Sequence, residues 1–257
     1  MELRPCSRGV KSVTACELVT TVKILHAGAT ITSGVILPHW VGSASAVVPA
    51  AATSAPHIRP RQDWGADLPP TGPLDAEQPG DVRFLLVHHS ASANDYETSG
   101  VAAQIRSFYH LHTSPSKGWH DVAYNFLVDR FGGVWEGRQG STTQPVKGDA
   151  TGGSQGYAIL CCFIGNHEAA PPSQEAQQAM VALLAWLADS YAIDTAPGAT
   201  TSFTSRGSNR WPPGASVTTT TIAGHRDMSH TACPGDASYE LVKNTFPQLV
   251  TQARLAR

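Results

Sequence analysis

The residues best suited to chemistry lie near the C-terminal end of the chain, in the segment 223–236. His225 and Cys233 stand eight residues apart there, immediately before a predicted helix start. Imidazole nitrogen and thiolate sulfur are common zinc ligands, and a catalytic zinc usually takes three protein ligands and leaves its fourth position to water. The spacing therefore predicts two ligands of a metal site that needs a third.

The third ligand is predicted far upstream, where an apolar run over residues 82–87 ends in two histidines. Such a run is typical of a buried strand, which delivers His88 and His89 at its C-terminal end. Adjacent strand residues face opposite sides of a sheet, so only one of the two can point at a metal ion. The pattern alone leaves the choice between them open.

The segments that must position these residues alternate between strand-like and helix-like patterns. This order predicts one α/β domain over residues 58–257. Strands are expected at residues 82–89, 122–128, 134–138, 158–164 and 220–223. Helices are expected to start at the capping residues Thr98 or Ser99, Ser173 and Asp236. Residues 194–216, rich in Thr, Ser, Gly and Pro, are expected to form a long loop, and Pro247 is expected to kink or split the last helix.

Residues 1–57 differ in character from the rest of the chain. Basic residues precede a mostly apolar segment over residues 24–41, and small residues follow it. This order is typical of a secretory signal peptide, so residues 1–57 are interpreted as a signal peptide and leader, with cleavage between residues 46 and 55. No run of about 18 uninterrupted apolar residues is present, so we expect no membrane span in the mature chain.

Charge and cysteine usage narrow the possible functions. The 257-residue chain has a formal net charge of −2 and lacks the basic excess of nucleic-acid-binding proteins, so no nucleic-acid partner is expected. Cys161 and Cys162 interrupt an apolar run. We interpret them as small buried residues rather than ligands, because free cysteine is among the most buried residue types.

Five short motifs follow one another along the chain and are informative as a set. They are Val-His-His-Ser at 87–90, Gly-Trp-His-Asp-Val-Ala-Tyr-Asn-Phe at 118–126, Trp-Glu-Gly-Arg at 135–138, Ile-Gly-Asn at 164–166 and the histidine–cysteine segment at 224–236. In this order they resemble the peptidoglycan recognition protein and phage-lysozyme-like N-acetylmuramoyl-L-alanine amidases, in particular a secreted actinobacterial-type member. The likeness covers about residues 58–245.

The resemblance implies a fold, an activity and a cofactor. The fold is a single α/β domain with a mixed central β-sheet flanked by helices. The activity is that of a zinc hydrolase, in which zinc-bound water cleaves the amide bond between N-acetylmuramic acid and L-alanine of peptidoglycan. The implied Zn²⁺ ligands are His88, His225 and Cys233, with His89 turned away. The implied partner is peptidoglycan, as glycan strand plus stem peptide, and we expect a secreted monomer that is extracellular or associated with the cell wall.

Two further residues take roles from the resemblance. Tyr124 matches the family tyrosine whose hydroxyl lies beside the zinc-bound water, which implies that it orients water or stabilises the oxyanion. Thr231 matches a position that is lysine in phage-type members and commonly threonine in catalytic recognition proteins, and its hydroxyl can donate a hydrogen bond to the oxyanion. Ala150 stands where many relatives have histidine, so substrate contacts on that rim do not carry over.

Two other functions fit the same pattern. A non-catalytic peptidoglycan-binding module would keep the groove without hydrolysis, but such relatives typically lack the cysteine ligand that Cys233 supplies here. A zinc-stabilised structural domain would need a fourth protein ligand, for which His230 and His89 are candidates. Hydrolysis is therefore the favoured prediction.

Overall fold

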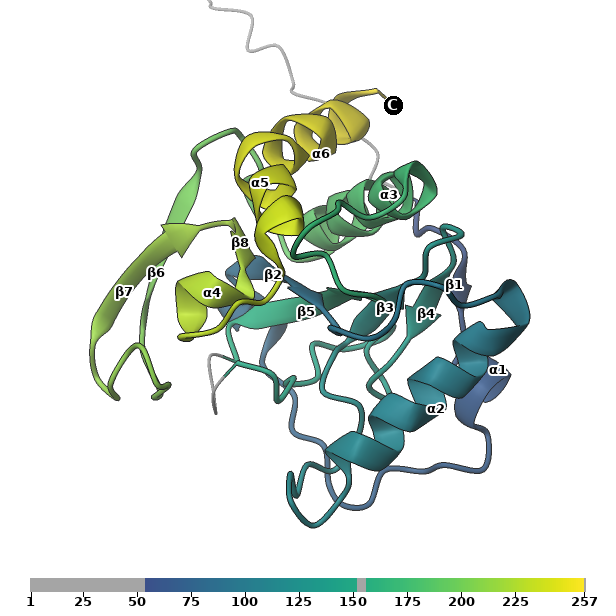
Figure 1. Cartoon of the computed structure of the whole chain (residues 1–257). Helices are drawn as coiled ribbons and strands as arrows, with labels where there is room; N and C mark the ends of the chain where they lie inside the picture. Colours follow the sequence, from purple (N-terminus) through teal and green to yellow (C-terminus); the bar gives the residue numbers. More distant parts are fainter. Residues whose placement is uncertain (1–53, 152–155, 257) are drawn as a thin grey trace, which may run out of the picture. The chain divides into compact units, whose positions relative to one another are not determined.

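The centre of the computed structural model, which describes residues 54–151 and 156–256, is a six-stranded mixed sheet (Figure 1). Its strands lie in the order β1 (Ile58–Arg59), β4 (Val134–Glu136), β3 (Phe126–Val128), β5 (Ala158–Phe163), β2 (Phe84–His89) and β8 (Ile222–Gly224). The β3–β4 pair is antiparallel and the other neighbours in this sheet are parallel. The predicted fold class is thereby confirmed. The predicted signal peptide and leader lies, up to residue 53, outside the described residues.

Helices cover both faces of the sheet (Figure 1). One face carries α3 (Gln174–Ser190), α5 (Asp236–Asn244) and α6 (Phe246–Leu255). The other face carries α1 (Gln62–Gly65) and α2 (Val101–His112), and α4 (His225–Met228) directly follows β8. Short 3₁₀ turns occupy Pro79–Asp81 and Thr98–Gly100.

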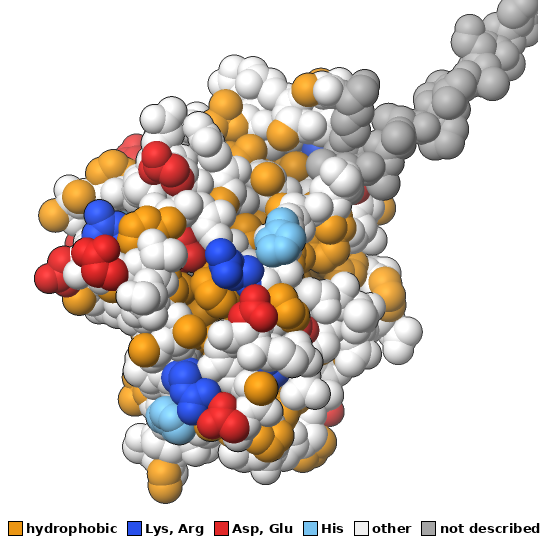
Figure 2. All heavy atoms as spheres, turned by 90° about the vertical axis from the view of Figure 1, so that its right-hand side faces the viewer, with side chains coloured by type: hydrophobic (Ala, Val, Ile, Leu, Met, Phe, Trp, Pro, Cys, Tyr) orange, Lys and Arg blue, Asp and Glu red, His pale blue; other side chains and the backbone are white. Residues whose placement is uncertain are grey.

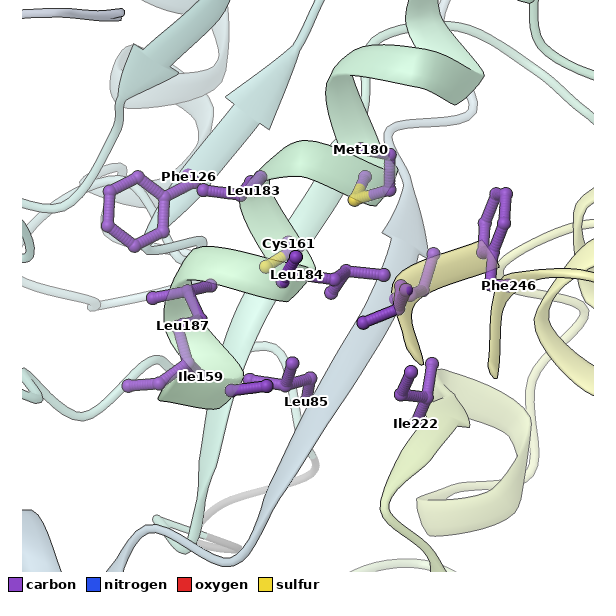
Figure 3. Close-up of a cluster of buried hydrophobic side chains, with 14 of the residues drawn as sticks. Leu85, Phe126, Ile159, Cys161, Met180, Leu183, Leu184, Leu187, Ile222 and Phe246 are labelled. Carbon is purple, nitrogen blue, oxygen red and sulfur yellow. The ribbon is translucent and has the colours of Figure 1, made fainter. Parts of the chain in front are cut away.

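Alternation along β2 divides its side chains between two hydrophobic clusters. Leu85 and Val87 pack on the α3 side with residues such as Met180 and Leu184, as Figure 3 shows for this cluster. Phe84 and Leu86 belong to a cluster on the opposite face. Because successive strand residues face opposite sides, the two histidines that end β2 are also divided between the faces.

The long helix α3 begins where the sequence predicts it. The hydroxyl of Ser173 accepts a hydrogen bond from the backbone N–H of Ala176 at 3.1 Å, which is the contact of an N-capping serine. Glu175 lies in the first turn, where a negative charge is favoured by the helix dipole. The split of the C-terminal helix at Pro247 is also confirmed, since α5 ends at Asn244 and Pro247 stands in the first turn of α6.

The prediction of a loop over residues 194–216 is wrong in part. It contains β6 (Thr200–Thr204), which pairs antiparallel with β7 (Ser216–Thr220) in a separate two-stranded ribbon. Phe203 is the one buried residue of β6, and its ring stacks on Phe84 at 5.4 Å between centroids. A single apolar residue among threonines and serines carries no alternating pattern, so periodicity could not reveal this strand.

The strand predicted over residues 122–128 is also shorter than expected. Its first residues leave the sheet, and the side chain of Asn125 takes the place of a backbone partner. Asn125 Oδ1 accepts from the backbone N–H of Leu160 at 2.8 Å, and its Nδ2 donates to the carbonyl of Val146 at 2.7 Å. A side-chain amide thus ends the ladder at Phe126.

Two predicted caps are wrong as well. Residues 98–100 form a 3₁₀ turn, and Gly100 precedes α2 without a side-chain cap. Gly235 rather than Asp236 precedes α5, with a φ of 86° that favours glycine. The carboxylate of Asp236 instead accepts from Arg226 at 2.6 Å.

Charged side chains of both signs lie on the surface of the domain (Figure 2). On the face drawn in Figure 2, basic and acidic side chains are interspersed rather than gathered by sign. Within residues 54–151 and 156–256, no helix is both long enough and apolar enough to cross a membrane.

Candidate metal centre

His88 and His225 are brought together by the pairing of two parallel strands. Val87 of β2 lies opposite Gly224 of β8, so the next residue of each strand projects from the same edge of the sheet. The two imidazole centroids are 4.5 Å apart. Residues separated by 137 positions in the chain are therefore neighbours because of strand register.

Cys233 completes the group from the loop between α4 and α5. Its Sγ atom lies 3.6 Å from Nδ1 of His88. One potential ligand atom from each of His88, His225 and Cys233 lies within 4.8 Å of the others. The carbonyl of Cys233 accepts from the N–H of Arg226 at 3.0 Å, which closes this loop back onto the start of α4.

The donor set fits a zinc ion. The Nε2 atoms of His88 and His225 are buried and have no hydrogen-bond partner among residues 54–151 and 156–256. Burial lowers the pKa of His88 well below its usual value and that of His225 to about 4, so both rings are neutral near pH 7. Neutral imidazole is the form that binds metal, and two such rings with a cysteine are a donor set that zinc prefers.

The thiol of Cys233 needs a cation to lose its proton. Burial raises its pKa to about 12, although the N–H of His89 and the charge of Arg226 act in the opposite direction. Burial outweighs these two effects together. A bound cation deprotonates a coordinating thiol, so the proton and the metal compete for this sulfur.

The other two histidines considered as ligands do not join the group. His89 faces the opposite side of β2, where its Nδ1 accepts from the N–H of His167 at 3.1 Å. His230 is exposed, and its N–H donates to Asn209 at 2.8 Å. The structure thus places His88 rather than His89 beside His225 and Cys233.

Tyr124 lies directly against this group. Its ring is half-buried, with its centroid 5.2 Å from that of His88. Burial, with a smaller effect of the nearby Cys162 and Cys233, raises the pKa of Tyr124 well above its usual value. The phenol is therefore a neutral hydrogen-bond donor at the edge of the site.

Thr231 is exposed on the loop that carries Cys233. Its hydroxyl oxygen accepts from the backbone N–H of Cys233 at 3.2 Å, so its own proton is not used in this contact. The structure assigns it a contact with the cysteine, and its role toward substrate stays a prediction. Ala150 is buried among apolar residues such as Phe84 and Leu160.

Two residues beside the site were not assigned to it by sequence reasoning. Cys162 pairs in register with His88 across β5 and β2, and therefore shares its face of the sheet. His112 is buried on α2, where its Nδ1 accepts from the N–H of Ala123 at 3.1 Å, and its ring lies 5.7 Å from that of Tyr124. No local signal marks either residue, because strand pairing and helix docking bring them to the site.

Solved structures with a similar fold indicate the class of protein. The fold is that of peptidoglycan recognition proteins. Drosophila peptidoglycan recognition protein SD aligns with a TM-score of 0.56 and 24% identity, over 74% of this chain and 95% of its own. One chain of the ectodomain complex of recognition proteins LCa and LCx, solved with bound tracheal cytotoxin, aligns with a TM-score of 0.56 and 25% identity, over 73% of this chain and 95% of its own.

Sequence comparison gives the family. The N-acetylmuramoyl-L-alanine amidase family matches residues 78–236, and the chain belongs to it. Mouse peptidoglycan recognition protein 1 is 31% identical over 194 residues, which span 75% of this chain and 90% of that protein. Human N-acetylmuramoyl-L-alanine amidase is 29% identical over 203 residues, which span 77% of this chain and 30% of that protein. Membership supports peptidoglycan binding or amidase activity.

Proposed function

We propose that this protein is a zinc-dependent N-acetylmuramoyl-L-alanine amidase. It hydrolyses the amide bond between N-acetylmuramic acid and the L-alanine of the peptidoglycan stem. The observation that carries the proposal is the group of His88, His225 and Cys233, whose ligand atoms lie within 4.8 Å of one another. Family membership supports peptidoglycan as the substrate.

Each of the three residues has a defined task. His88 and His225 present neutral nitrogen donors, and Cys233 presents a sulfur that binds as thiolate. When bound there, Zn²⁺ supplies Lewis-acid chemistry, which acidifies water and polarises a carbonyl. Neither His89 nor His230 lies in the group, so the described residues offer three ligands rather than the four of a closed structural site.

Two hydroxyl groups serve the reacting carbonyl in this proposal. Tyr124, kept neutral by burial, donates its proton toward the oxyanion that develops on the scissile amide. Thr231 donates its hydroxyl proton from the cysteine loop, since the contact with Cys233 uses only its oxygen as acceptor. Neither hydroxyl carries a positive charge, unlike the lysine of phage-type relatives.

The second candidate function is peptidoglycan recognition without cleavage. It is favoured by the names of several relatives, which are recognition proteins. The cysteine supports hydrolysis over this alternative, because a pure binding module has no need for a buried thiol beside two imidazoles whose Nε2 atoms lack a partner among the described residues.

The remaining parts of the proposal concern the chain as a whole. Residues 58–257 form the amidase domain, residues 1–57 are the signal peptide and leader, and the mature protein acts outside the cell as a monomer. Ala150 stands where many relatives have histidine and packs among apolar residues, so the substrate contact of that histidine does not carry over.

The test is mass spectrometry of peptidoglycan fragments after incubation with the purified chain, which is treated with chelator or restored with zinc. We expect release of intact stem peptides with a free L-alanine amine, lost on chelation and regained with zinc. The variant Cys233→Ser, which conserves size, is expected to lose release by more than about 100-fold, beyond the loss that outer contacts of a metal site cause. Tight binding of fragments without cleavage in every condition overturns the proposal in favour of recognition alone.

A further inference from the structure

His89 stands at the end of β2, next to a proposed metal ligand but on the other face of the sheet. It is 5% exposed, and its ring is on the side of α3 and α5 rather than beside His225. A buried polar ring requires a partner, and the partner here is a backbone group. The contacts of His89 show what the second histidine of the pair does.

The backbone of His89 contacts the sulfur of Cys233 directly. Its N–H lies 3.4 Å from Cys233 Sγ, and its carbonyl oxygen lies 3.6 Å from the same atom. The N–H can donate to the sulfur whether it is a thiol or a thiolate. The position of the sulfur therefore depends on the end of β2 remaining in place.

The ring of His89 reaches the same cysteine through a second route. Its Nδ1 accepts from the N–H of His167 at 3.1 Å, and the carbonyl of His167 accepts from the N–H of Ala237 at 3.1 Å. Ala237 lies in the first turn of α5, the helix that follows the cysteine. Two hydrogen bonds in series, one on each side of the His167 peptide groups, thus connect the ring to the segment after Cys233.

Close packing makes this connection stiff. Gly235 lies so near His167 that a Cβ atom there would be 2.3 Å from the carbonyl carbon and oxygen of His167. The backbone of His167 is therefore the surface on which the turn after Cys233 rests. A movement of His167 must displace that turn.

The segment around His167 has other attachments, at the buried Gly165 and the exposed Asn166, and the His167 ring packs edge-on against Phe163. Asn94 bonds both the N–H and the carbonyl of Asn166 at 2.8 Å, and Ser90 accepts from the N–H of Gly165 at 2.9 Å. The bond to His89 is the buried hydrogen bond made by the N–H of His167, the residue that contacts Gly235. Its loss leaves the buried N–H of His167 without an acceptor.

We propose that His89 is a positioning residue for Cys233, which holds the sulfur in place through its own backbone and through the His167 backbone beneath the Cys233–Gly235 turn. The inference rests on the proposed zinc site, since it concerns the ligand that the site requires. The two histidines of the pair then have separate tasks. His88 binds the zinc ion, and His89 fixes the position of Cys233.

The test uses the full chain with two substitutions at one position. His89→Ala removes the acceptor, whereas His89→Asn places an amide oxygen close to the position of Nδ1 and keeps it. Zinc affinity is measured by competition with a chromophoric chelator. We expect His89→Ala to weaken zinc binding about 10–100-fold, as loss of a supporting contact around a metal ligand typically does, and His89→Asn to restore most of it.

The matched control is His112→Ala, which also removes a buried histidine whose Nδ1 accepts from a backbone N–H. Its contacts are with Ala123, Trp119 and Tyr124 rather than with Cys233 or the 165–168 segment, so zinc affinity is expected to stay within about threefold of wild type. Equal losses in His89→Ala, His89→Asn and His112→Ala overturn the proposal, because they show a general packing defect.

A second readout does not need metal at all. Hydrogen exchange of the His167 and Ala237 amides in the metal-free protein is expected to accelerate in His89→Ala and to remain slow in His89→Asn. If the wild-type chain binds no zinc, the proposed function fails. The exchange rates of the His167 and Ala237 amides still show whether His89 holds this segment in place. Unchanged protection of Ala237 in His89→Ala overturns the positioning role even if zinc binds.

Discussion

At the scale of single residues, the site depends on burial of groups that normally carry or exchange a proton. Burial keeps His88, His225 and Tyr124 neutral and keeps the thiol of Cys233 protonated without metal. Neutral imidazoles are ready to bind a cation, and a neutral phenol is ready to donate a hydrogen bond. The same desolvation thus prepares the nitrogen ligands and the donor, while it makes the thiolate dependent on the metal.

Substitution of Tyr124 by Phe tests the donor role. The ring would keep its packing against His88, and only the hydroxyl is lost. We expect kcat on peptidoglycan to fall about 10²–10³-fold, the usual cost of removing one oxyanion donor, with KM little changed. Steady-state kinetics on a defined muropeptide would measure this.

Zinc content of the same variant, determined by metal analysis, is expected to equal that of wild type. A Tyr124→Phe enzyme that keeps full kcat contradicts a role in the reaction. A variant that has lost its zinc instead assigns the tyrosine a structural part in the centre.

At the scale of elements, the site lies at the C-terminal ends of the parallel strands β2 and β8, whose sheet is covered by helices. β2 is buried along its whole length and pairs with both β5 and β8, so its C-terminal end is held on two sides. α3 covers one face of these strands through Met180, Leu183, Leu184 and Leu187 (Figure 3). Helix α3 contributes no ligand, but its packing keeps the strand ends in register.

Leu184→Ala tests this support. Leu184 is fully buried in the main core, and removal of such a side chain typically costs about 2–5 kcal/mol in free energy of unfolding. We expect a lower denaturation midpoint in urea, with an unchanged slope. Val181→Ala, a partly buried position on the same helix, serves as the control with a smaller expected loss. Equal losses at the two positions are contrary to this account of the core.

At the scale of the whole molecule, buried histidines make the stability of the metal-free protein depend on pH. Burial lowers the pKa of His89, His112, His167 and His225 to about 4. Between about pH 6.5 and pH 4 the unfolded chain binds protons that the folded chain does not. Stability is therefore expected to fall as the pH falls through this window, and to level off below it.

His112→Asn checks the sign and size of this effect. Asparagine can keep the acceptor for the N–H of Ala123 but does not titrate. Each such histidine adds up to about 1.4 kcal/mol per pH unit to the slope, so the variant should show a shallower decline of unfolding free energy between pH 6.5 and pH 4. Urea titrations at several pH values measure it, with His110→Asn on the exposed side of the same helix as the matched control. An unchanged slope in His112→Asn contradicts burial of a neutral ring.

Local sequence patterns were sufficient to predict several elements of this protein. The apolar run before His88, the capping serine of α3 and the break at Pro247 are short-range signals, and the structure has the corresponding elements. The motifs also indicated the family and the residues proposed for the zinc site. These features depend on hydrophobic periodicity and backbone restrictions, which act over a few residues and can be read from the chain.

Contacts between distant segments required the tertiary structure. The sequence alone could not decide that His88 shares a face with His225, because that depends on the register of β2 against β8. It also could not reveal β6, whose one buried residue finds its partner in Phe84, or the bond between His89 and His167. Pairing between segments is stabilised by burial and hydrogen bonds that form only when the chain is folded, so no window of neighbouring residues contains it.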